Sequence, residues 1–220
     1  MNDLANAFLL VYAGLFPIVN PVGSAPIFLG LTRHCTVAER HALAGKVAVN
    51  GFLLLLGSLL VGSYVLEFFG ITLPVVRIAG GLVVTSFGWK LLHTEGGMGG
   101  QDPVDPEGKR GEPTDAFYPL TMPLTVGPGS ISVAITLGSR RPTPTYELAH
   151  LAFLGGGALG GLLAIAATIF VCYRFAERIV AVLGASGTNV LMRLSAFILL
   201  CIGIEIVWSG YDALLGAGAR

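Results

Sequence analysis

Two apolar segments of the sequence are interrupted by similar runs of helix-breaking and small polar residues. The first extends from Phe16 to Pro26 and the second from Met122 to Ser132. Aligned on each other, they have the same residue at three positions: Pro17 and Pro123, Gly23 and Gly129, Ser24 and Ser130. Interrupted helices expose backbone N–H and C=O groups, which can bind the charged ends of a small zwitterion. The paired breaks therefore predict a binding site for a small solute.

The residues of each break indicate how the helix is interrupted. Pro21 is expected to end a half-helix near Asn20, because proline lacks an N–H and clashes with the preceding turn. Gly23 is expected to allow a strained backbone, and Ser24 to cap the next half-helix. In the second break Ser130 is the expected cap. The predicted substrate-binding residues are Asn20, Pro21, Gly23, Ser24, Thr125, Gly127, Pro128, Gly129 and Ser130.

The expected chemistry of the site depends on backbone dipoles. A helix N-terminus carries roughly +0.5 of a charge together with unpaired N–H groups. Two such ends facing each other near the membrane midplane would hold a carboxylate, while free carbonyls and the Asn20 amide accept from an ammonium. No Lys or Arg lies near the breaks in the sequence, and this arrangement needs none. The alternative is that the prolines and glycines only kink packed helices.

The composition places these segments in a membrane. Of the 220 residues, 54% are hydrophobic and 12% are charged, with a mean hydropathy of +0.77. Soluble domains average about 25% charged residues. The apolar blocks predict an all-α membrane protein, whose partner is the lipid bilayer, with about six spans at 4–31, 43–69, 73–92, 117–137, 148–173 and 189–214. The absence of a basic stripe argues against nucleic acid, and the scattered cysteines predict neither a disulfide nor a metal site.

A polar stretch rich in glycine, proline and acidic residues divides the chain. We predict a first three-helix repeat over residues 1–94, a linker over 95–116 and a second three-helix repeat over 117–220. Because each half has an odd number of spans, the second half enters the membrane inverted relative to the first. The predicted fold is thus an inverted 3+3 repeat with two discontinuous helices.

The distribution of Lys and Arg predicts the orientation. Nine fall on the side of the linker, namely Arg33, Arg40, Lys46, Lys90, Lys109, Arg110, Arg174, Arg178 and Arg193. Four fall on the other side, namely Arg77, Arg140, Arg141 and Arg220. The bias predicts a cytoplasmic linker and both termini outside, with the pair at 140–141 as the exception.

Glu205 is the one acidic residue well inside an apolar span, which makes it a candidate for carrying a coupling proton. It also lies near Trp208 and Tyr211, so a hydrogen-bonded interfacial glutamate is the alternative. No cofactor is expected, and the sequence leaves coupling to H⁺ or Na⁺ open. The glycines between residues 155 and 161 predict close helix packing, either within one subunit or in a homo-oligomer.

An enzymatic function is not expected. Residues 184–187 read GASG, which resembles a serine-hydrolase loop around Ser186. A serine nucleophile needs a base within hydrogen-bond reach, however, and no histidine follows Ser186 in the chain.

The residues of the breaks resemble those of the MarC family, six-helix bacterial inner-membrane proteins also called the neutral amino acid transporter family. Residues 20–28 read NPVGSAPIF, which is similar to the family's N-P-[IV]-G-x-x-P-[IL]-[FY] signature. Residues 119–129 read PLTMPLTVGPG, which is similar to its P-L-x-x-P-L-x-x-G-P-G pattern. The segment from Leu183 to Arg193 also resembles the approach to the sixth helix of these proteins.

This resemblance implies a LysE-superfamily-like transporter in the bacterial inner membrane that moves small neutral amino acids, such as glycine and alanine, by alternating access. The alternatives are an exporter of another small metabolite and a membrane scaffold or stress-response accessory protein that transports nothing.

Overall fold

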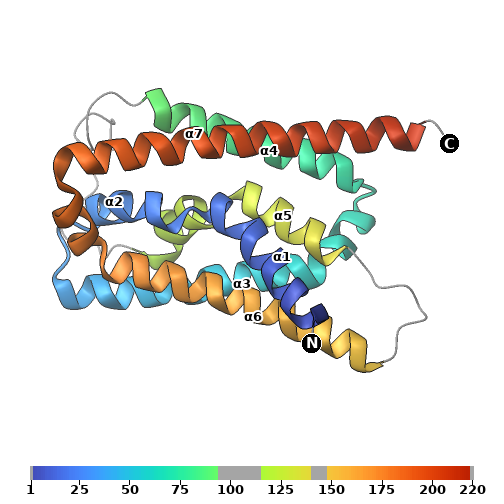
Figure 1. Ribbon diagram of the computed structural model, residues 1–220, viewed down its shortest axis with the longest axis horizontal. Helices are drawn as coiled ribbons and strands as arrows, with labels where there is room; N and C mark the ends of the chain where they lie inside the picture. The colour runs from blue at the N-terminus through green and yellow to red at the C-terminus, as the bar shows by residue number, and fades with distance from the viewer. Residues whose placement is uncertain (1, 94–114, 140–147, 219–220) are drawn as a thin grey trace.

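The computed structural model describes residues 2–93, 115–139 and 148–218, and every regular element within these ranges is helical (Figure 1). In chain order the elements are α1 (Asn2–Val19), α2 (Pro21–Leu31), α3 (Val37–Phe68), α4 (Leu73–His93), η1 (Ala116–Thr125), α5 (Pro128–Gly138), α6 (Leu148–Arg174) and α7 (Ala176–Gly218). The predicted all-α fold is confirmed. Most of the predicted linker, together with Arg140 and Arg141, lies outside the described residues.

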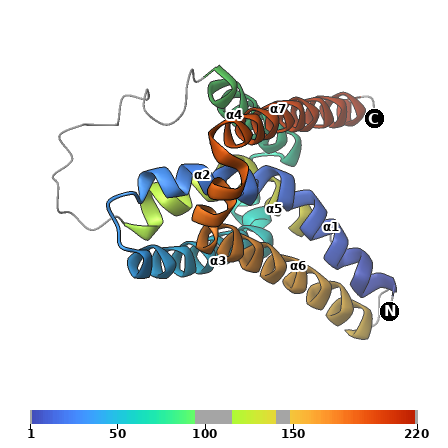
Figure 2. The same ribbon diagram turned by 60° about the vertical axis from the view of Figure 1, so that its left-hand side comes forward.

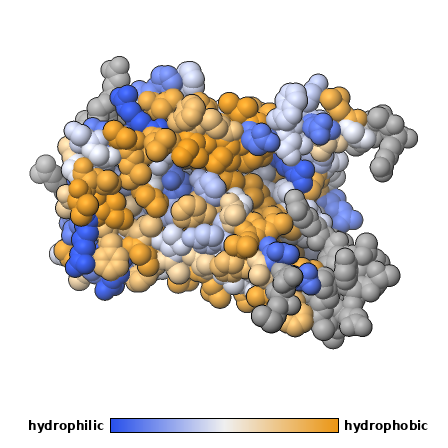
Figure 3. Space-filling view, in the orientation of Figure 1, coloured by the Kyte–Doolittle hydropathy of each residue, from blue (hydrophilic) through white to orange (hydrophobic). Residues whose placement is uncertain are grey.

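Apolar helices of membrane-spanning length account for most of the molecule. Four of them, α3, α4, α6 and α7, are long and apolar enough to cross a bilayer individually. Two bent pairs pass the same test together: α1 with α2, bent by 41°, and η1 with α5, bent by 70°. If each bent pair counts as one span, the total is six, as predicted, and two of the six are broken. The surface in Figure 3 is largely apolar, as a lipid-facing surface has to be.

The helix ends fall into two groups at opposite ends of the molecule (Figures 1 and 2). At one end α2 and α4 finish and α3, η1 and α7 begin; we call this the linker end. At the other end α1, α4 and α6 begin and α3, α5 and α7 finish. The Lys and Arg residues that the sequence assigned to one side of the membrane lie toward the linker end wherever they are described, and Arg193 is the deepest of those on α7.

Helices α4 and α7 pack along each other through glycines. A Cβ added to Gly81 would lie 2.8 Å from the Gly203 carbonyl oxygen, and one added to Gly88 would lie 2.7 Å from the backbone nitrogen of Leu200. A Cβ on Gly210 would lie 2.9 Å from the Pro74 carbonyl oxygen. Small residues allow such close backbone approach, which is a main source of helix association in lipid. We call α4 with residues 185–218 of α7 the α4–α7 unit, and the remaining helices the bundle.

Glycines also join α6 to α1 within the bundle. Gly157 faces the backbone of Leu4, and a Cβ on Gly161 would lie 3.0 Å from the Phe8 carbonyl oxygen. The predicted packing through these glycines is therefore found within one subunit. Nothing lies within 4 Å of a Cβ added at Gly155 or Gly156, and a homo-oligomer remains a prediction.

Corresponding elements of the two halves contact each other. Helix α3 packs on α6 and α4 on α7, while the bent pair of each half packs mainly on the first long helix of the other half: α1 and α2 on α6, and η1 and α5 on α3. A two-fold axis that relates the two halves would produce this pattern, because it would pair each helix with its counterpart in the other half. The inverted repeat itself, and the domain boundaries drawn from it, remain predictions.

The α4–α7 unit is connected to the bundle through two glycines with left-handed backbone. Gly70, in the turn between α3 and α4, has φ +68°. Gly184, which interrupts α7, has φ +64° and separates residues 176–183 from the rest of the helix. A Cβ would meet nothing within 4 Å at either site, so the backbone conformation is what favours glycine there.

At the linker end, the buried Arg40 connects three elements. Its guanidinium donates to the Thr32 carbonyl at 3.0 Å and to the Cys35 carbonyl at 3.2 Å, just beyond the C-terminus of α2. It also forms an ion pair with Glu177, at the start of α7. These two bonds involve carbonyls of the turn that follows α2, not those of the helix itself. Together with the ion pair, they fix α2, the start of α3 and residues 176–183 to one another.

Candidate functional site

The first break is formed by Asn20 in the left-handed conformation, with φ 46° and ψ 55°. Asn20 is the N-cap of α2, since its side-chain oxygen accepts from the Gly23 N–H at 3.2 Å, and Pro21 follows at the first helical position. The prediction that Ser24 caps this helix is wrong. Asn before Pro is the stronger cap, because Pro needs no partner for an N–H and its φ suits the first turn.

Gly23 is required for a different reason from the one predicted. It lies inside α2 without positive φ, so it does not provide a strained backbone. A Cβ at Gly23 would instead lie 2.7 Å from the Ser195 Cβ on α7 and 2.5 Å from the Asn20 Nδ2. Gly23 thus allows α2 and α7 to approach closely at the break.

The second break has a different backbone. Gly127 is the N-cap of α5 in an extended conformation, with φ −97° and no side-chain cap, and Pro128 occupies the first helical position. The prediction that Ser130 caps α5 is wrong, because its hydroxyl donates to the Gly127 carbonyl at 2.9 Å and accepts no N–H bond of a cap. Gly129 packs directly on the Val84 side chain of α4, leaving no room for a Cβ.

One buried side chain links the two breaks. The Tyr173 hydroxyl, near the end of α6, is 2.7 Å from the Thr125 hydroxyl of the second break. It also interacts with the Ser24 hydroxyl of the first break. The Tyr173 ring stacks on Phe28 of α2, with 4.4 Å between ring centroids. The structure therefore brings the two breaks, which are distant in sequence, to either side of one aromatic residue.

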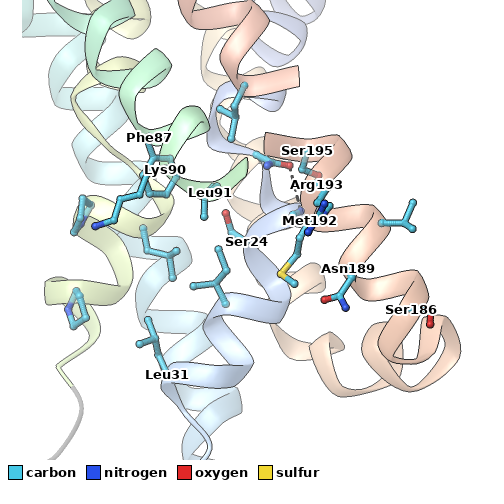
Figure 4. Close-up of a pocket in the computed structure, with 18 residues that line it drawn as sticks. Ser24, Leu31, Phe87, Lys90, Leu91, Ser186, Asn189, Met192, Arg193 and Ser195 are labelled. Carbon is cyan, nitrogen blue, oxygen red and sulfur yellow. Dashed lines mark hydrogen bonds between the residues drawn. The ribbon is translucent and has the colours of Figure 1, made fainter. Parts of the chain in front are cut away.

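A cavity of about 720 Å³ lies between the first break and the α4–α7 unit (Figure 4). Asn20, Gly23 and Ser24 line it, and it extends to Leu31 at the end of α2 and Lys90 near the end of α4. The cavity therefore leads from the first break toward the linker end. Its volume is in the range of about 300–1,000 Å³ that is usual for small-molecule sites.

A second, much smaller cavity of about 80 Å³ lies at the other break. Its lining includes all five predicted residues of that break: Thr125, Gly127, Pro128, Gly129 and Ser130. The two cavities are neighbours, because both are lined by Phe87, Pro123, Leu124 and Leu199. Of the nine predicted residues, only Pro21 lines neither cavity.

The larger cavity also contains polar residues that the sequence did not reveal as part of the site. Helix α7 contributes Ser186, Asn189, Arg193 and Ser195, and α4 contributes Lys90 (Figure 4). Two cations therefore line the cavity that leads from the first break, although none is near that break in the sequence. The contribution of α7 could have been predicted, because the polar residues at 186, 189 and 193 have the spacing of one helix face within an apolar segment.

Glu205, the predicted proton carrier, is exposed on α7 and lines neither cavity. The structure does not bring it to the breaks. Among the described residues there is also no cluster of His, Cys, Asp and Glu that could hold a metal ion.

Comparison with known proteins assigns the family. A family model described as "MarC family integral membrane protein" matches residues 5–215. The chain belongs to the MarC family. It is 30% identical, over 96% of both chains, to the UPF0056 inner membrane protein MarC of Salmonella typhimurium. It is 31% identical to the UPF0056 membrane protein YhcE of Escherichia coli, covering 92% of this chain and 91% of that one.

A third relative, a UPF0056 membrane protein of Pyrococcus abyssi, is 29% identical over 98% of this chain and the whole of its own. The chain is thus a multi-pass integral membrane protein, similar over nearly its full length to proteins named for the inner membrane. No solved structure matches it.

Proposed function

We propose that the protein is a secondary transporter of small neutral amino acids, such as glycine and alanine, that works by alternating access around its two broken helices. The observation that carries the proposal is the pair of neighbouring cavities, one at each break, that differ in size by a factor of about nine (720 against 80 Å³). A site that is open toward one end of the molecule and closed toward the other is what alternating access requires.

The proposed movement is a rotation of the α4–α7 unit against the bundle. Both cavities lie between these two bodies, and the four residues common to both cavities come from α4, α7 and η1. The glycine contacts between α4 and α7 support movement of the pair as one body. Gly70 and Gly184 are suitable joints, because glycine accommodates large backbone rotations at low cost.

The solute is expected to bind where the cavities meet, near Asn20, Ser24 and Gly127. Small residues at the breaks leave room for an amino acid with a short side chain, and the N-termini of α2 and α5 favour a carboxylate. An inner-membrane location, with the linker in the cytoplasm, would make the larger cavity open to the cytoplasm. Coupling to H⁺ or Na⁺ is part of the proposal, and Glu205 is its proton candidate.

Uptake into proteoliposomes tests the proposal. Purified protein is reconstituted, and uptake of labelled glycine and alanine is measured without a gradient, with a pH gradient and with a Na⁺ gradient. We expect saturable uptake of both amino acids above protein-free vesicles, and stimulation by one gradient if transport is coupled. Absence of uptake by protein that unfolds cooperatively in a thermal melt would contradict a transport function and favour an accessory role.

A further inference from the structure

Arg193 lines the larger cavity together with the residues of the first break. It lies on the side of α7 that faces α2 (Figure 4). Ser195, two positions further along α7, is in contact distance of Gly23, as a Cβ there would be 2.7 Å from the Ser195 Cβ. Arg193 is therefore held next to the first break by a close helix contact, and its side chain is exposed where it lines the cavity.

Arg193 also lies within the span and not at its boundary. Trp208, exposed on α7 toward the opposite end, is typical of a membrane interface. Arg193 and Trp208 are fifteen positions apart on α7, a distance of about 22 Å along the helix, whereas the hydrocarbon core is about 30 Å thick. A cation at this depth needs a water-filled cavity or an anionic partner.

The described surroundings of Arg193 supply the cavity but no anionic partner. No Asp or Glu is among the residues that line the cavity, and no described residue forms an ion pair with Arg193. The other charged residue of the lining, Lys90, is also a cation. Asn189 and Ser186 continue from Arg193 toward the linker end on the same face of α7, which gives an anion a polar route to the guanidinium.

We propose that Arg193 binds the carboxylate of the solute, and that the carboxylate, more than the ammonium, is the group this site requires. The inference rests on the proposed function for the statement that the bound solute is also transported. A guanidinium recognises a carboxylate through two parallel hydrogen bonds, which an amide or an amine cannot replace. The site then accepts small monocarboxylates with or without an amino group and rejects alaninamide, the carboxylate-free analogue of alanine.

Isothermal titration of the purified protein in detergent tests this preference directly. The ligands are alanine, propionate and alaninamide, and the variants are Arg193→Gln and Arg193→Lys. The matched control is Arg178→Gln, which removes an exposed arginine near the start of the same helix, where it lies over the Phe175 ring and lines neither cavity. Labelled alanine uptake is measured on the same preparations.

We expect the wild type to bind alanine and propionate and to bind alaninamide at least about tenfold more weakly. Arg193→Gln should weaken carboxylate binding by about ten- to a hundredfold and abolish discrimination against alaninamide, while Arg193→Lys keeps part of both. A residue with only a structural role would lower all three affinities together. Arg178→Gln should resemble the wild type.

Three results would overturn the inference. The wild type could bind alaninamide and alanine with equal affinity, or it could bind no carboxylate. The Arg193→Gln variant could keep the wild-type discrimination. If Arg193→Gln does not fold, Arg193→Lys and the wild-type ligand series still decide. Arg193-dependent carboxylate binding without alanine uptake would contradict the proposed function and leave the assignment of Arg193 intact.

Discussion

The two helix breaks share a motif but differ in backbone and surroundings. At the first, Asn20 turns the chain in a left-handed conformation, and the break opens into a cavity of about 720 Å³. At the second, Gly127 is extended, the bend is 70° instead of 41°, and the cavity is about 80 Å³. Similar sequences thus border a large cavity at one break and a small one at the other.

The contacts of α4 account for the small size of the cavity at the second break. The Ser132 hydroxyl on α5 donates to the Val76 carbonyl on α4 at 3.0 Å, and Arg77 on α4 donates to the Thr136 hydroxyl on α5 at 3.4 Å. At the first break an arginine of α7, Arg193, lines the cavity instead. The comparison teaches that the α4–α7 unit contacts both half-helices but bonds them differently: α4 is hydrogen-bonded to α5 at the second break, whereas α7 approaches α2 through Gly23 and Ser195 at the first.

The largest effect is expected from filling the space at the second break. Gly129→Val places two methyl groups against Val84 and should abolish transport, because overpacking costs about 1–3 kcal/mol and prevents α4 from closing on α5. Gly129→Ala with Val84→Ala should recover activity relative to Gly129→Ala alone. Uptake assays and thermal melts of the three variants measure this. Normal transport by Gly129→Val and by Gly23→Val would mean that both breaks are only kinks.

A large difference in accessibility is expected between the two cavities. In a background without Cys35, Cys172 and Cys201, a cysteine at Asn189 should react with a water-soluble, membrane-impermeant thiol reagent, and one at Ser130 should not. In oriented vesicles the reaction at residue 189 should occur only from the side of the linker. Equal labelling of the two sites would show that the breaks do not differ in access.

A smaller effect is expected from weakening the closed end. Ser132→Ala removes the hydrogen bond to Val76, which contributes about 1 kcal/mol and corresponds to roughly a fivefold change in the ratio of closed to open forms. A cysteine at Ser130 should therefore react faster in the Ser132→Ala background. The control is Ser139→Ala, which should change nothing, because among the described residues the Ser139 hydroxyl bonds only to the Thr136 carbonyl of α5.

Alanine substitutions at the N-caps of the two breaks should differ in their effect on stability. Asn20→Ala loses both the cap and a residue suited to the left-handed conformation, and we expect a destabilisation of about 1–2 kcal/mol. Asn20→Gly should cost only a few tenths of a kcal/mol, since glycine adopts this conformation freely. Gly127→Ala should have little effect, because Gly127 is extended and lacks a side-chain cap. The melting temperatures of the three variants in detergent test this order.

The smallest effect is expected at Glu205, which lies on the exposed face of α7 away from both cavities. Glu205→Gln should transport at close to the wild-type rate without a gradient. If proton coupling uses this carboxylate, the variant should lose only the stimulation by an imposed pH gradient. A variant that keeps this stimulation would remove Glu205 from consideration as the coupling residue.

The breaks could be located from sequence because Pro and Gly act on the backbone locally, whatever the helices pack against. The caps were predicted wrongly for a local reason: Asn20 competes for the cap and is favoured by the proline that follows it. The closed second break could not be foreseen, since it depends on Val84 and Val76, which belong to another helix.

The positive charge of the larger cavity could not be predicted from the residues around the first break. Arg193 lines the cavity because α7 packs on α2, and Lys90 lines it because α4 packs along α7; both contacts join the end of the chain to its first half. The glycines that permit the pairing are visible in the sequence, but a glycine on an apolar helix does not indicate its partner. The number of spans was easier to predict, because it depends on composition and length alone.

The close contact between α4 and α7 has a consequence for biosynthesis. Helix α4 ends at His93, whereas its partner begins at Ala176, so most of the second half must be translated before the two can meet. Until then, Gly81 and Gly88 of α4 face lipid or another temporary partner, with the backbone exposed where the α7 backbone will later cover it. The last helix to be made is therefore the one that completes the site, and a ribosome that stops before Arg193 leaves a membrane protein with both breaks but no finished cavity.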